Sequence, residues 1–296
     1  MPRGWRCAGL RWSPDGAALV WRDGARERIS ALAYGRELAF RAIGARHCAG
    51  VRGLDCPLGP LGASVSGRST GGQCPDCARL DRSRSVAADT VADDPRPYTV
   101  YLAWFGPGMV KVGITAEARG SARLLEQGAV VFTLLGRGPL MAARRTEELL
   151  RTALDVPDRV PYAAKRAVRA TLPADPVERA AEVRELYGRA VALSGWPESL
   201  ERAALEPVDH VHVFGLAGAP PATGVIGELV DGGRVAGRLV AAAGPDLHLD
   251  RGDGAVLVLD TRLVRGWELA AAGDGEVTVP VRDLAGTDPA VQDGLF

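Results

Sequence analysis

The chain has 296 residues, of which 47% are hydrophobic and 24% are charged, and its formal net charge is zero. This length suffices for a substantial core and predicts two or three domains. The sequence has no apolar run of about 18 residues and no signal-peptide pattern, so it argues against a membrane protein and predicts a cytoplasmic one.

The zero net charge hides a segregation of charge along the chain. Residues 1–97, 98–172 and 173–296 carry net charges of +5, +5 and −10. The basic N-terminal and central segments can attract polyanions. The acidic C-terminal segment can shield these basic segments or weaken their non-specific binding to polyanions. A solvated surface with a chance asymmetry explains the same numbers. Lys111 and Lys165 are the only lysines, a bias typical of GC-rich coding, so a single arginine indicates less here than elsewhere.

Residues 1–45 contain short hydrophobic runs separated by turn signals and are expected to form a small β unit. Residues 6–9 recur in weak, gapped form at 234–237, where a valine stands in the place of Cys7. This repeat favours a packed core thiol at Cys7 over a metal ligand. It also suggests that the two ends of the chain are related β units that pack together.

Residues 46–82 hold four cysteines that predict a metal site: Cys48, Cys56, Cys74 and Cys77. The two-residue gap of the last pair lets both sulfurs face one ion from a tight turn, whereas the gap of the first pair is wider than usual. Because few large apolar residues occur between 44 and 84, a closed tetrahedral site with structural zinc would stabilise this segment. The alternatives are a redox pair, buried thiols, or a site that His47 or Cys7 joins.

Residues 83–97 are polar and rich in proline and aspartate, which indicates a linker before a central domain over residues 98–172. Residues 100–105 alternate as a strand with two distinct faces, and the Gly-Pro-Gly turn at 106–108 leads into a second strand.

A three-residue loop in this hairpin would pair Tyr101 with Gly113 and Ala103 with Lys111. Tyr101 and Lys111 would then share one face. Gly113 is expected to leave an opening beside the phenol, as an approaching ligand would need.

The helix that follows the hairpin is expected to carry Arg119, Arg123 and Gln127 on one stripe, because these residues are four apart. Glu147 lies in a further helical run, residues 142–154.

Residues 173–206 are expected to form a helical connector, with Asp175 as its N-cap and Pro176 at the first helical position. Strand-like runs and Asp/Gly turns predict a C-terminal small β-barrel or sandwich over 207–283, followed by a tail over 284–296. The predicted class is α+β: N-terminal β and zinc-binding segments, a central hairpin/helix domain and a C-terminal β domain.

The central hairpin resembles the GIY-YIG nuclease superfamily. Thr99-Val100-Tyr101 stands at the first triplet of that family, and Lys111-Val112-Gly113 stands at the second. The resemblance covers roughly a quarter of the chain, about residues 98–165. The KVGIT stretch that starts at Lys111, the phrase at 126–129 and the cysteine cluster together are similar to a bacterial domain-of-unknown-function family.

This resemblance implies the chemistry of a single-metal phosphodiesterase. Tyr101 would help to deprotonate water, Arg123 would stabilise the charged transition state, and Glu147 would hold Mg²⁺ or Mn²⁺. Lys111 stands where the family usually has a second tyrosine, although some branches have lysine there. Arg123 lies two residues beyond the family spacing, so Arg119 is the alternative. The histidine or asparagine that often ends the core is absent.

The sequence therefore predicts a protein that engages DNA or RNA, and one hypothesis is a divalent-metal-dependent phosphodiester hydrolase. A second hypothesis is a catalytically degenerate DNA- or RNA-binding module with structural zinc. A third is a protein-interaction scaffold whose basic face meets its own acidic segment or a partner. No membrane partner is expected, and the sequence indicates no oligomeric state.

Overall fold

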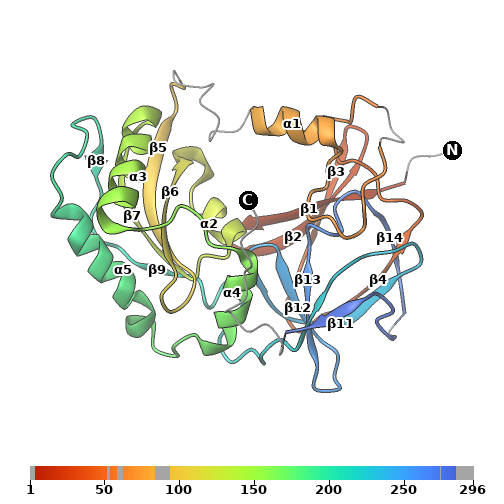
Figure 1. Cartoon of the computed structure of the whole chain (residues 1–296). Coiled ribbons are helices and arrows are strands. Elements are labelled where there is room, and N and C mark those ends of the chain that lie inside the picture. The colour runs from red at the N-terminus through yellow and green to blue at the C-terminus, as the bar shows by residue number, and fades with distance from the viewer. Residues whose placement is uncertain (1–3, 52–53, 59–62, 84–93, 274, 285–296) are drawn as a thin grey trace, which may run out of the picture.

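The chain folds into two β-sheets with few helices, which confirms the expected mixed α+β class. The sheets form the two halves of the molecule, and the short helices α2 (Ala122–Gln127) and α4 (Tyr162–Val168) lie between them (Figure 1). No helix among the described residues is long and apolar enough to cross a membrane. The computed structural model describes residues 4–51, 54–58, 63–83, 94–273 and 275–284.

The larger sheet combines strands from both ends of the chain. Its strands are β1 (Arg6–Ser13), β2 (Gly16–Asp23), β3 (Arg26–Ala31), β4 (Glu37–Ile43), β10 (Gly224–Ile226), β11 (Arg234–Ala243), β12 (Asp246–Asp250), β13 (Val256–Asp260), β14 (Glu268–Ala271) and β15 (Val281–Asp283). Their order is β15-β10-β13-β12-β11-β4-β14-β1-β2-β3. β4 pairs with both β11 and β14, so an N-terminal strand lies between two C-terminal ones.

This pairing bears on the C-terminal β-barrel expected over 207–283. Within the described part of the chain, the sheet is open and ends at β15 and β3, so a barrel is not confirmed. The C-terminal strands extend the N-terminal ones because β11 and β14 form their ladders with β4. Cys7 is 1% exposed and lies in the apolar core of this sheet, which confirms the expected core thiol.

The smaller sheet belongs to the central part of the chain and has the order β6-β5-β7-β8, with β9 also paired to β7. Its strands are β5 (Pro97–Trp104), β6 (Val110–Ala116), β7 (Val131–Pro139), β8 (Glu201–Arg202) and β9 (Val208–Asp209). The helices α3 (Leu140–Leu154) and α5 (Pro176–Val191) cover one face, against Val100, Leu102 and Trp104 of β5. Tyr101 and Ala103 lie on the opposite face with Leu124 of α2.

The hairpin has the register that the alternation predicts: Tyr101 pairs with Gly113, and Ala103 pairs with Lys111. The helix expected through 119–127 is instead interrupted. A 3-10 turn, η1 (Glu117–Arg119), ends at Gly120, whose φ of 46° only glycine adopts without strain, and α2 begins at Ala122.

The segments that flank the central domain follow the expectations only in part. Asp175 accepts a hydrogen bond from the amide of Val177, and Pro176 opens α5, as a capped helix requires. The segment after α5 returns to the small sheet as β8. Most of the expected linker, 83–97, and of the expected tail, 284–296, lies outside the described residues.

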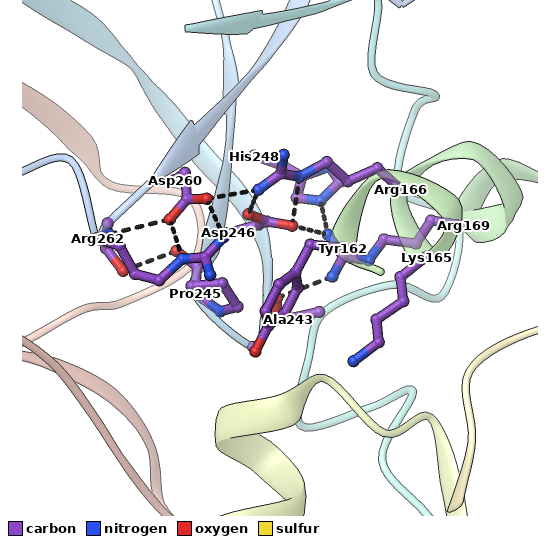
Figure 2. Close-up of polar contacts among 12 residues, drawn as sticks. Tyr162, Lys165, Arg166, Arg169, Ala243, Pro245, Asp246, His248, Asp260 and Arg262 are labelled. Atoms are coloured by element: carbon purple, nitrogen blue, oxygen red, sulfur yellow. Dashed lines mark hydrogen bonds and ion pairs between the residues drawn. The ribbon is translucent and has the colours of Figure 1, made fainter. Parts of the chain in front are cut away.

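A buried ion-pair network fastens α4 to the larger sheet (Figure 2). Arg166 binds Asp246 at 2.6 Å and Asp260 at 2.7 Å. Arg169, in the 3-10 turn η2 (Arg169–Thr171), binds Asp246 at 2.7 Å, and Arg262 binds Asp260 at 2.6 Å. Asp246 and Asp260 are paired residues on β12 and β13, so the three guanidinium groups relieve a repulsion between facing carboxylates.

The ionised state of Asp246 depends on these arginines. Its side chain has no exposed surface, and burial alone would raise its pKa. The guanidinium groups of Arg169 and Arg166 outweigh burial and hold the pKa of Asp246 below its ordinary value.

We therefore expect Asp246→Ala to lower the free energy of unfolding by about 3 to 5 kcal/mol, because it leaves the buried guanidinium of Arg169 without a carboxylate partner among the described residues. Asp250→Ala is the matched control: Asp250 ends the same strand but pairs with the exposed Arg238. Urea unfolding of both variants checks this. A loss no larger for Asp246→Ala than for the control would contradict the prediction.

Candidate functional site

The hairpin brings Tyr101 and Lys111 together, as the sequence predicts. The Nζ atom of Lys111 lies 5.7 Å from the centre of the Tyr101 ring and donates a hydrogen bond of 3.2 Å to the carbonyl of Asp158. Burial and the neighbouring Arg123 lower the pKa of Lys111 to about 8. Lys111 is therefore about half-protonated near pH 8 and becomes mostly neutral above it.

The opening expected beside Tyr101 is filled by the tyrosine itself. A β-carbon on Gly113 would lie 2.5 Å from the phenolic oxygen of Tyr101, so the glycine leaves room for the ring beside β6. Gln127, at the end of α2, donates a hydrogen bond of 2.9 Å to the same oxygen. Tyr101 is 1% exposed, and burial raises its pKa.

The two candidate arginines lie beside this tyrosine but are not equivalent. Arg119 is ion-paired with Glu126 at 2.6 Å, whereas Arg123 approaches the same carboxylate only to 3.7 Å. Both guanidinium groups lower the pKa of Tyr101, and the effect of Arg123 is larger. Arg123 is therefore the less neutralised of the two cations near the phenol.

Glu147 reaches the same place from α3. Its side chain is half-buried, and burial raises its pKa, while Lys111 acts in the opposite direction. Glu147 also raises the pKa of Tyr101, so all these groups lie within electrostatic range of one another. Among the described residues, no hydrogen bond or ion pair reaches the carboxylate of Glu147. Such a carboxylate is available to a hard cation such as Mg²⁺.

A residue that the sequence analysis left without a role, Lys165, belongs to this neighbourhood. It lies on α4, is 4% exposed, and packs over the rings of Phe105 and Tyr162 at 3.8 and 4.5 Å. Burial and the charge of Lys111 lower its pKa to about 7. Both lysines of the chain therefore lie at this site. Only these two of the 36 basic residues are lysines, and this rarity is the sequence signal that could have identified Lys165 as a site residue.

The cysteine cluster forms a separate candidate site, as expected. The sulfur atoms of Cys48, Cys56, Cys74 and Cys77 all lie within 4.8 Å of one another. Two of these separations are 3.9 and 3.7 Å, between Cys56 and Cys74 and between Cys56 and Cys77. Tetrahedral zinc with Zn–S bonds of about 2.3 Å requires sulfurs about 3.8 Å apart. The four thiols can therefore bind a metal ion such as zinc.

Backbone amides in this cluster donate hydrogen bonds that stabilise a thiolate at Cys48. The amides of Gly50 and Cys74 donate to the sulfur of Cys48 at 3.4 and 3.1 Å. This turn requires glycine at position 50. The φ of Gly50 is 68°, and a β-carbon there would lie only 1.8 Å from the carbonyl oxygen of Leu54. Neither His47 nor Cys7 belongs to the group of ligand atoms that the described residues form.

Comparison with known proteins identifies the family. The profile of the family described as "Protein of unknown function (DUF2797)" matches residues 35–269, so the chain belongs to this family. No curated protein and no solved structure matches the chain. The expected membership of a domain-of-unknown-function family is thus confirmed. The relation to GIY-YIG nucleases and the bacterial origin stay predictions.

We expect the purified protein to contain a bound metal ion such as zinc, and Cys74→Ser to lose it, because three thiolates and a serine hydroxyl hold zinc weakly. Cys7→Ser is the matched control, since this equally buried thiol lies outside the cluster. Elemental analysis after gel filtration measures both. Metal content unchanged in Cys74→Ser would contradict this assignment.

Proposed function

We propose that the central domain is a GIY-YIG-like domain that binds a phosphodiester of DNA or RNA and hydrolyses it with a divalent cation. The proposed site consists of Tyr101, Lys111, Arg123 and Glu147. The observation that supports it best is the half-buried carboxylate of Glu147, for which the described residues supply no hydrogen bond or ion pair. This carboxylate lies within electrostatic range of a tyrosine, a lysine and an arginine.

Each of these groups suits one part of phosphodiester chemistry. Lys111 and Arg123 supply positive charge for the non-bridging oxygens, where charge accumulates during the reaction. Mg²⁺ or Mn²⁺ held by Glu147 would stabilise the leaving oxygen. The oxygen of Tyr101 accepts a hydrogen bond from Gln127. Burial raises the pKa of Tyr101, and this hydrogen bond and the guanidinium groups of Arg123 and Arg119 oppose that rise.

A second candidate function is nucleic-acid binding without cleavage. The burial of Tyr101 favours it, because a phenol that is 1% exposed has no access to a water nucleophile in this conformation. Arg119 and Arg123 would then serve only as phosphate contacts.

We also propose that the cysteine cluster holds structural zinc. Four thiolates complete the tetrahedral shell, so no position is left for a substrate. The backbone bonds from Cys48 to Ala63 and from Ala49 to Gly72 tie the segment together around the cluster. Metal binding would supply the stability that this segment lacks in apolar core.

We expect Glu147→Gln to reduce Mg²⁺-dependent cleavage of labelled single- or double-stranded substrates at least about 100-fold, because it removes the metal-binding carboxylate. Binding at low salt should persist. Glu148→Gln is the matched control, since this neighbouring carboxylate is exposed and pairs with Arg151.

The outcomes of this assay separate the two functions. Cleavage by the wild type that survives in Glu147→Gln would refute the assigned role of the carboxylate. Binding with no cleavage by the wild type, in either Mg²⁺ or Mn²⁺, would establish the second function.

We further expect the affinity for nucleic acid to fall roughly tenfold between pH 7 and pH 9. The pKa of Lys111 is about 8, so its ammonium is present below that pH and lost above it. Lys111→Arg keeps the charge at both pH values and should flatten the dependence. Fluorescence anisotropy at constant ionic strength measures the affinity. An equally steep fall in Lys111→Arg would assign the titration to another group.

A further inference from the structure

The ammonium group of Lys165 caps the end of α2. Its Nζ atom donates a hydrogen bond of 2.9 Å to the carbonyl oxygen of Gln127, the last residue of that helix. The last carbonyls of a helix have no partner inside the helix, and a cation there also meets the negative end of the helix dipole. Lys165 therefore fixes the terminus of the helix that carries Arg123.

The same glutamine continues the contact to Tyr101. Gln127 is 6% exposed, and its side-chain amide donates to the phenolic oxygen at 2.9 Å. Two buried hydrogen bonds thus link Lys165 through Gln127 to Tyr101. A displacement of the Gln127 backbone would move the only hydrogen-bond donor that the described residues present to this phenol.

Stability alone does not explain a lysine at this position. Lys165 is buried against the aromatic rings of Phe105 and Tyr162, and no carboxylate among the described residues lies within ion-pair distance of its ammonium. Burying an ammonium group without a carboxylate is costly, and an apolar side chain of similar length would fill the same space without that cost.

The position of Lys165 depends in turn on the larger sheet. Arg166 is its neighbour on α4 and is ion-paired with Asp246 and Asp260 (Figure 2). Arg169 also donates to the carbonyl oxygen of Ala243 at 2.9 Å. The C-terminal strands therefore hold α4 at a fixed distance from α2.

We propose that Lys165 is a positioning residue that holds Gln127 and, through it, the phenol of Tyr101, and that the C-terminal strands thereby form part of the phosphodiester site. The role of the positioned phenol rests on the proposed function. The positioning itself is a property of the fold and can be tested without any substrate.

The test uses tyrosine labelled with ¹³C at Cζ. The chain has five tyrosines, and Tyr101→Phe assigns the resonance of Tyr101. Lys165→Met keeps the stem but removes the ammonium, and it should shift this resonance. Lys165→Arg should restore most of the wild-type shift. If Lys165→Met does not fold, Gln127→Met breaks the second hydrogen bond and must shift the same resonance.

The control variant is Arg202→Met. Arg202 also stacks on an aromatic ring, that of Trp196 at 4.8 Å, and donates to the carbonyl of Val191 at the end of α5, but it contacts none of the site residues. We expect this variant to leave the Tyr101 resonance unchanged. A merely structural Lys165 would lower thermal stability while leaving that resonance in place, and this result would overturn the proposal.

Binding of a fluorescein-labelled oligonucleotide at low salt supplies the functional readout. Lys165→Met should weaken binding about tenfold, and Lys165→Arg should recover it. If the wild type does not bind, the proposed function fails, but the Tyr101 resonance still decides whether Lys165 positions the phenol. Wild-type affinity in Lys165→Met would show that the phenol's position does not matter for binding and would overturn the link to the site.

Discussion

The pairing of Asp246 with Arg166 and Arg169 is the constraint on which the arrangement of the two sheets depends. A fully buried carboxylate tolerates burial only with its cationic partners in place, so the contact permits one geometry between α4 and β12. Because α4 also carries Lys165, the same geometry extends to α2 and the hairpin. A buried ion-pair network at the boundary between the halves thus places α4 beside the candidate site.

The candidate site brings several positively charged side chains together, and its two lysines are largely shielded from water. Lys111 and Lys165 both have lowered pKa values because they are buried near other positive groups. Such an arrangement is unfavourable until an anion arrives, since a phosphate would relieve the mutual repulsion. This repulsion is the physical basis of the proposal that the site takes a phosphodiester, and it applies equally to binding and to hydrolysis.

Local features could be predicted from the sequence, and long-range ones could not. Period-two alternation and a three-residue turn define the register of Tyr101 with Gly113, because only nearby residues decide it. The ladder of β4 with β11 joins segments far apart in the chain, and only a weak repeat suggested it. The ring of Tyr101 lies in the space beside Gly113, and its oxygen accepts a hydrogen bond from Gln127, 26 residues away. No local sequence pattern encodes this contact.

The insertion of β4 between β11 and β14 has a consequence for how the chain is made. During synthesis β4 emerges well before its two neighbours, β11 and β14, so both of its edges stay open until those later segments have been made. The central hairpin meets its partners early, whereas the large sheet is completed by contacts of high sequence separation and should form slowly. An exposed β4 is in the meantime a template for strands of other chains, which makes the nascent protein prone to aggregation until β11 and β14 cover it.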